Sequence, residues 1–171
     1  IYLDHRGCGR STGERETWHL DQWADDIAIF CSTLSIQSPV VFGQSFGGMV
    51  AMHYAVRHPG GISKLILSST AAQFRLDETM KMMRKLGGPR AADVACEFFS
   101  NPSKAAYETY GQVCLPLYSN PNVPAAGAFR DRAIERPEVA FHFFSDEMAQ
   151  MDMRAEIANI TCPTLVIGGG I

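Results

Sequence analysis

The chain has 171 residues, and its 46% hydrophobic content is enough for one globular domain with a sizeable core. Its net charge of -3 comes from 15 basic and 18 acidic residues mixed along the chain, which excludes nucleic acid and membrane surfaces as expected partners. No apolar run approaches the ~20 residues of a membrane span, and five scattered cysteines without a Cys-x-x-Cys pair indicate reduced thiols in a cytoplasmic protein without a metal site.

Residues 1–70 alternate between strand and helix patterns at a spacing typical of a parallel α/β sheet. The expected elements are the end of a strand at Ile1–Leu3, a tight glycine-rich loop in "DHRGCGRSTGE", a helix from Trp18 to about Leu34, a buried strand at Val40–Phe42, a helix after Ser45 and a buried strand at 64–69. The predicted fold class is therefore α/β with a mostly parallel sheet.

Residues 71–155 break this alternation and are typical of several helices, of which "LDETMKMMRKLGG" is the clearest. Breaks are expected at "GGPR", "NPS" and "SNPNVPAAG". The strand pattern resumes in 156–171 with "TLVIGGG". We therefore expect a helical lid at 71–155, inserted between core segments 1–70 and 156–171. Both ends of the chain lie in or near apolar segments, so we expect a fragment of a longer protein.

The stretch "VVFGQSFGGMV" places Ser45 between a strand and a helix, with Gly43, Gln44, Gly47 and Gly48 around it. A nucleophile elbow needs this arrangement, because small neighbours allow a serine to stand in a strained turn with its hydroxyl exposed. The alternative is a glycine-rich turn whose serine only caps the following helix. The pattern favours Ser45 as the nucleophile of a hydrolase.

Two motifs resemble those of the α/β-hydrolase superfamily, and the resemblance extends over essentially the whole chain. "GQSFGG" is similar to its nucleophile elbow, and "DHRGCGRS", about 40 residues earlier, is similar to the loop that precedes the elbow by one helix. The resemblance is to the proline iminopeptidase-like branch. It implies a structural role near the site for that loop, whose residues include Asp4, Arg6, Gly7 and Gly9.

An acyl-transfer serine also needs a histidine, an acid and oxyanion donors. The resemblance implies that the backbone N–H of Phe46 is one donor and that the acid and the histidine follow later in chain order. Neither is expected in this chain, so we expect the 171 residues alone to be inactive. Structural roles are expected for His5, His19, His53, His58 and His142.

The resemblance implies an ester or amide substrate, either a small molecule or a short peptide, and no cofactor. In the iminopeptidase-like branch, lid carboxylates hold a free amine. The candidates here are Glu97, Glu108, Glu135 and Glu147. Alternatively, lid phenylalanines would line an apolar pocket of a carboxylesterase or lactonase; these are Phe98, Phe99, Phe141, Phe143 and Phe144.

Two readings from other classes remain. "GCGRSTG" invites a dinucleotide-binding interpretation, but its glycine spacing is one residue too long and no acidic residue closes a second strand. A non-catalytic binding module that keeps the fold is the other alternative. Retention of the elbow sequence favours retained chemistry.

Overall fold

The computed structural model describes residues 1–119 and 132–169, which form two compact units. The first unit comprises Ile1–Arg6, Ser11–Phe74 and Gln150–Ile171, and the second comprises Gly7–Arg10 and Arg75–Ala149. Most of the segment predicted as a lid belongs to the second unit. Its function as a lid stays a prediction.

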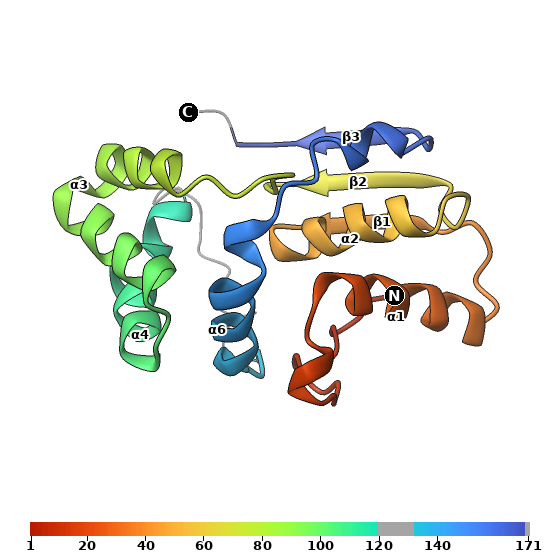
Figure 1. The fold of residues 1–171 in the computed structure, drawn as a ribbon, viewed down its shortest axis with the longest axis horizontal. Helices are drawn as coiled ribbons and strands as arrows, with labels where there is room; N and C mark the ends of the chain where they lie inside the picture. The colour runs from red at the N-terminus through yellow and green to blue at the C-terminus, as the bar shows by residue number, and fades with distance from the viewer. Residues whose placement is uncertain (120–131, 170–171) are drawn as a thin grey trace. The chain divides into compact units, whose positions relative to one another are not determined.

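The first unit is built on three parallel strands in the order β1-β2-β3 (Figure 1). The strands are β1 (Val40–Gln44), β2 (Lys64–Ser68) and β3 (Thr164–Ile167). Val40 pairs with Lys64, and Leu65 pairs with Thr164. This pairing confirms the predicted parallel sheet. Because the strands are parallel, their carboxyl ends lie at one edge, which is where α/β folds bind ligands.

Two helices of the first unit pack together, and the second of them packs on the sheet (Figure 1). They are α1 (Leu20–Thr33) and α2 (Phe46–Arg57), close to the predicted ranges. The small residues Ala51 and Ala55 are almost fully buried, as is Val50 beside them. A face of small side chains allows α2 to approach the strands closely.

Charged side chains join α1 to α2 at the surface. Arg57 donates from Nε and Nη2 to the two carboxylate oxygens of Asp25, at 3.1 and 2.9 Å. Nε2 of His58 lies 2.7 Å from the same carboxylate, and Arg57 also pairs with Asp21 at 3.1 Å. Arg57, and after it His58, holds the pKa of Asp25 below its ordinary value.

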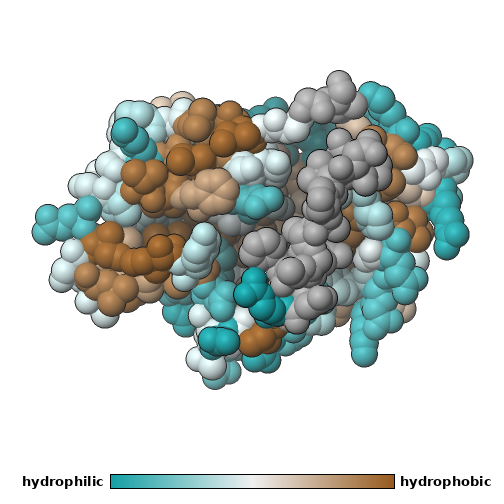
Figure 2. Space-filling view, turned by 180° about the vertical axis from the view of Figure 1, so that it is seen from behind, coloured by the Kyte–Doolittle hydropathy of each residue, from teal (hydrophilic) through white to brown (hydrophobic). Residues whose placement is uncertain are grey.

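Two predictions about the first strands are wrong. Ile1–Leu3 forms no strand, because this segment pairs with none of the strands of the described sheet, and Ile1 and Tyr2 are exposed. Val40 and Phe42 do lie in β1, but they are 56% and 59% exposed instead of buried. Gly43, on the opposite face of the strand, is buried, so only one face of β1 is covered. Figure 2 shows apolar areas on the side opposite to the view of Figure 1.

The second unit contains the helices α3 (Leu76–Ser100), α4 (Lys104–Val113) and α6 (Pro137–Asp146). The break predicted at "GGPR" is a kink inside α3, where Gly88 has φ 75° and precedes Pro89. The break predicted at "SNPNVPAAG" lies almost wholly outside the described residues. Short 3-10 helices occur at Arg15–Thr17, Leu115–Tyr118, Met148–Gln150 and Glu156–Asn159.

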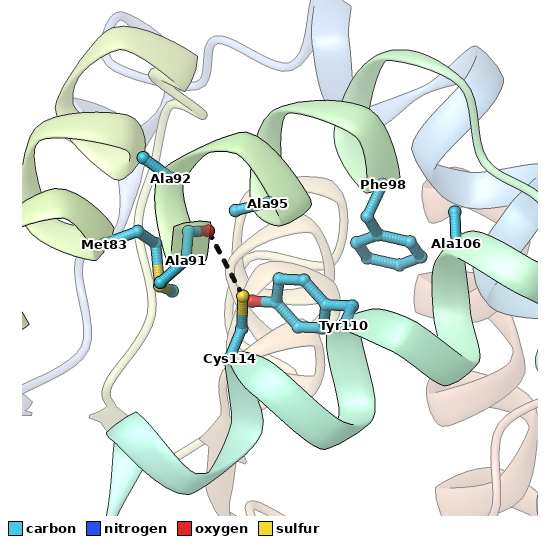
Figure 3. Packing of buried hydrophobic residues seen from close by; sticks show 8 residues of the cluster. All are labelled: Met83, Ala91, Ala92, Ala95, Phe98, Ala106, Tyr110 and Cys114. Atoms are coloured by element: carbon cyan, nitrogen blue, oxygen red, sulfur yellow. Dashed lines mark hydrogen bonds between the residues drawn. The ribbon is translucent and has the colours of Figure 1, made fainter. Parts of the chain in front are cut away.

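The core of the second unit forms between α3 and α4 (Figure 3). Phe98 lies over Tyr110 with ring centroids 4.6 Å apart, and the thiol of Cys114 donates to the carbonyl oxygen of Ala91 at 3.4 Å. Cys114 is fully buried, and burial raises the pKa of its thiol. Within the two described ranges, no helix combines the length and the apolar character that crossing a membrane requires.

Candidate active site

Ser45 lies in the sharp turn between β1 and α2. Its backbone has φ 51° and ψ -120°, a conformation that costs an L-residue on the order of 1–3 kcal/mol. The residue is exposed, and its side chain does not cap α2. The geometry therefore removes the explanation that Ser45 is only a helix cap, and it leaves a hydroxyl group on a strained turn at the carboxyl edge of the sheet.

Two of the predicted elbow glycines lie where no side chain fits, one against backbone and one against another side chain. A Cβ on Gly43 would lie 2.7 Å from Cα of Gly48 and still nearer to the carbonyl oxygen of Gly47. A Cβ on Gly48 would lie 2.6 Å from Cβ of Thr70. The absence of a side chain at Gly43 therefore allows the end of β1 to approach the start of α2, and its absence at Gly48 makes room for Thr70. Gln44, between Gly43 and Ser45, is the exposed last residue of β1.

Hydrogen bonds fix the elbow to the neighbouring strand. The N–H of Ser45 donates to the carbonyl oxygen of Ser68, the last residue of β2, at 3.0 Å. In return, Oγ1 of Thr70 donates to the carbonyl oxygen of Ser45 at 2.8 Å. Thr70 was not singled out by the sequence, because only the pairing of β1 with β2 brings it beside Ser45.

Phe46 is the first residue of α2, and its ring is held by two aromatic neighbours. Ring centroids of His5 and Trp23 lie 5.5 and 4.9 Å away, both in edge-on arrangements. The N–H groups of a helix's first turn point out of its start, which is the geometry that receives anionic oxygen. The predicted oxyanion role of the Phe46 N–H stays a prediction.

The loop that contains Asp4 and Arg6 is anchored to α1. Nε of Arg6 donates to the carboxylate of Asp26 at 2.8 Å, and Nε1 of the buried Trp23 donates to the carbonyl oxygen of Arg6 at 3.0 Å. The carbonyl oxygen of Asp4 accepts from Ser11 Oγ at 2.7 Å. These contacts fit a structural role for Asp4 and Arg6. Gly7 and Gly9, the other two loop candidates, have φ 80° and 54°.

The five histidines contact groups other than Ser45. Nδ1 of His19 accepts from the N–H of Gln22 as the cap of α1, His53 and His58 approach Asp21 and Asp25, His142 approaches Asp146, and His5 packs on Phe46. Burial lowers the pKa of His5, which favours its neutral form. In the described ranges no group of three or more His, Cys, Asp or Glu side chains is arranged to hold a metal ion.

The candidate amine-binding carboxylates of the second unit have different neighbours, and their proposed role stays a prediction. Glu97 lies near Asn101, Glu108 near Lys104, and Glu135 near the hydroxyl of Tyr107. All three are exposed, and Glu147 is half-buried. Exposure of this kind is the ordinary situation of surface carboxylates.

The candidate pocket phenylalanines pack on one another or on other rings of the same unit. Phe98 contacts Phe144 at 5.0 Å, Phe99 contacts Phe144 at 5.3 Å, and Phe143 contacts Phe144 at 5.7 Å between ring centroids. Phe141 packs on Tyr107 at 5.8 Å. These side chains contribute to the helix packing of the second unit.

A cavity of about 560 Å³ lies beside the elbow within the first unit. Its mostly apolar lining includes residues 1–5, β1 and two residues of α2, namely Gly47 and Ala51. Ser45 is not part of this lining. The cavity therefore carries no assignment as the place where a substrate would meet the serine.

Comparison with known proteins identifies what this chain is similar to. The family model described as alpha/beta hydrolase fold matches residues 1–170. A proline iminopeptidase of Lactiplantibacillus plantarum is 31% identical over 131 residues, which cover 73% of this chain and 46% of that protein. The chain therefore spans about half the length of this relative.

Solved structures resemble the chain in fold. A proline iminopeptidase of Mycobacterium smegmatis matches with a TM-score of 0.65 at 22% identity, over 95% of this chain and 60% of that one. An enol-lactonase of Burkholderia xenovorans matches with a TM-score of 0.59 at 22% identity, over 97% and 60% of the two chains.

Proposed function

Because the chain belongs to the alpha/beta hydrolase fold family, we propose that the complete protein is a serine hydrolase whose nucleophile is Ser45. The observation that carries this proposal is the backbone of Ser45, which is held at φ 51° in the turn between β1 and α2 with an exposed hydroxyl that does not cap the helix. Strain of this kind is retained where a function uses it.

In the proposed reaction, Oγ of Ser45 attacks the carbonyl carbon of an ester or amide. A histidine takes the hydroxyl proton, the carbonyl oxygen becomes an oxyanion held by the N–H of Phe46, and the leaving group departs with the proton as the acyl-enzyme forms. Water then attacks the acyl-enzyme by the same steps and releases the carboxylic acid product. In this family the catalytic Asp or Glu and the histidine follow the serine in chain order. The carboxyl end of β3, at the same sheet edge as Ser45, is where we place the acid in the complete protein.

The substrate class that we propose is a short peptide from which an N-terminal residue is released, as the name of the 31% identical relative suggests. The second unit would act as a lid over the serine. Small esters and lactones are the alternative substrates, as the enol-lactonase among the similar solved structures suggests.

The test is a side-by-side assay of the complete protein on a prolyl arylamide and a short p-nitrophenyl ester. We expect turnover of the arylamide, and we expect Ser45→Ala to lower kcat by roughly 10⁴-fold or more. Ser38→Ala is the matched control, because Ser38 is also exposed and has φ 47° but precedes β1 at the opposite end of the strand.

Each result separates one part of the proposal from the rest. Turnover of the ester alone would remove the peptidase assignment and retain the serine hydrolase. An active Ser45→Ala variant would refute the nucleophile. Loss of activity in Ser38→Ala as well would show that the effect comes from altered folding at a strained serine.

A further inference from the structure

We propose that Thr70 is a positioning residue that orients the peptide group between Ser45 and Phe46, and this inference rests on the proposed function of that group. Thr70 follows β2 and is half-buried beside the elbow. Its Oγ1 donates to the carbonyl oxygen of Ser45 at 2.8 Å. It touches the backbone of the nucleophile residue and leaves the serine hydroxyl exposed.

The hydrogen bond acts on the oxyanion donor through the planarity of the peptide group. The carbonyl of Ser45 and the N–H of Phe46 belong to one rigid plane, so fixing the direction of the oxygen fixes the direction of the N–H. The same oxygen also accepts from the N–H groups of Gly48 at 2.9 Å and Met49 at 3.3 Å. The N–H groups of Gly48 and Met49 both belong to α2, and the hydroxyl of Thr70 is a third donor to this oxygen from outside the helix.

The same bond should also strengthen the donor. A carbonyl oxygen that accepts a hydrogen bond polarises its peptide group, and the N–H of that group becomes a better donor. An N–H that stabilises an oxyanion works best when it is already oriented before charge develops. The hydroxyl of Thr70 would therefore stabilise the transition state more than the bound substrate.

Thr70 is itself held in place by the sheet. The N–H of Ser69 donates to the carbonyl oxygen of Ile167 in β3 at 2.9 Å, and Ser69 has φ 46°. This turn directs the next residue back over the elbow. Gly48 provides the space, because a Cβ there would lie 2.7 Å from Oγ1 of Thr70. The absence of a side chain at Gly48 and the hydroxyl at Thr70 are thus two parts of one contact.

The test compares Thr70→Val, which replaces the hydroxyl by a methyl group of similar size, with Thr70→Ser, which keeps the hydroxyl. We expect Thr70→Val to lower kcat by about 10-fold, less than the 10²–10³-fold loss of a direct oxyanion donor, with KM unchanged. Binding of a trifluoromethyl ketone, which forms an oxyanion on the serine, should weaken by a similar factor. Thr70→Ser should retain kcat and ketone binding.

The outcomes distinguish this inference from the proposed function. Unchanged kcat in Thr70→Val, or an equal loss in Thr70→Ser, would overturn it, since the hydroxyl would then not be the active group. If Thr70→Val does not fold, Thr70→Ala against Thr70→Ser decides, because both lack the methyl group and only one keeps the hydroxyl. Full activity of Ser45→Ala in the same assay would instead refute the proposed function and the inference with it.

Discussion

Gly43→Ala tests whether the close approach of β1 and α2 holds Ser45 in place. The added Cβ would lie 2.7 Å from Cα of Gly48, whereas non-bonded carbon atoms prefer about 3.5–4.0 Å. The start of α2 must therefore move by about 1 Å, because the atoms in the way belong to the backbone and cannot rotate aside. Overpacking of this kind lowers the free energy of unfolding by about 1–3 kcal/mol. A displacement of that size at a nucleophile lowers the rate by about 100-fold.

The assay is urea denaturation together with ester and arylamide hydrolysis, both on the complete protein. Gly111→Ala is the control, because an added Cβ at this position in α4 lies 3.9 Å from Cδ1 of Leu115, an ordinary van der Waals distance. We expect Gly111→Ala to be at least as stable as the wild type and to keep its kcat/KM. A Gly43→Ala variant as stable and as active as Gly111→Ala would refute the reasoning that steric exclusion at Gly43 shapes the elbow.

Two further predictions concern groups away from the serine. Asp25→Asn should lower the free energy of unfolding by up to about 1 kcal/mol at pH 7, since the pair with Arg57 and His58 is partly exposed and screened by solvent. A carboxylate with a lowered pKa stabilises the fold at pH values above its ordinary pKa of 3.8. That contribution is lost as the pH falls through the pKa that the carboxylate has in the folded protein. The difference between variant and wild type should therefore be present in full near pH 7 and shrink in urea titrations as the pH falls below 3.8, and a difference that does not shrink there would contradict the ion-pair account. Iodoacetamide should modify the exposed Cys96 of the native protein and leave the buried Cys114, with its raised pKa, unmodified until urea is added. Equal rates at the two thiols in peptide mapping would show that the core between α3 and α4 is open.

The elbow could be predicted from the sequence because its requirements are local. A serine in a strained strand-to-helix turn needs small neighbours at fixed spacing, and Gly43 meets that need through its close approach to Gly47 and Gly48, only a few residues later. The parallel sheet was likewise predictable, since apolar runs separated by an amphipathic helix have few other arrangements. In both cases short-range chemistry determines the structure.

Thr70 could not be found in this way. It lies 25 residues from Ser45, and nothing in the sequence around it indicates a functional contact. The pairing of Gln44 with Ser68 and the turn at Ser69 bring it to the elbow. A contact that depends on strand register has no local sequence signal.

The exposure of the second face of β1 also could not be predicted from the sequence. The run Val40 to Phe42 has the composition of a strand covered on both sides, yet Val40 and Phe42 are exposed because no described element packs on them. An apolar side chain favours burial, but whether it is buried depends on the elements that pack against it. The glutamates of the second unit illustrate the same limit, since their acidity is visible in the sequence and their neighbours in the structure are not.

The most direct test of the central claim is to treat the complete protein with a fluorophosphonate and to locate the adduct by mass spectrometry. Such reagents modify a serine whose hydroxyl is activated as a nucleophile. We expect one adduct, on the peptide that contains Ser45, with loss of hydrolysis in proportion to labelling. An adduct on another residue, or full activity after Ser45 is labelled, would contradict the assignment of Ser45 as the nucleophile.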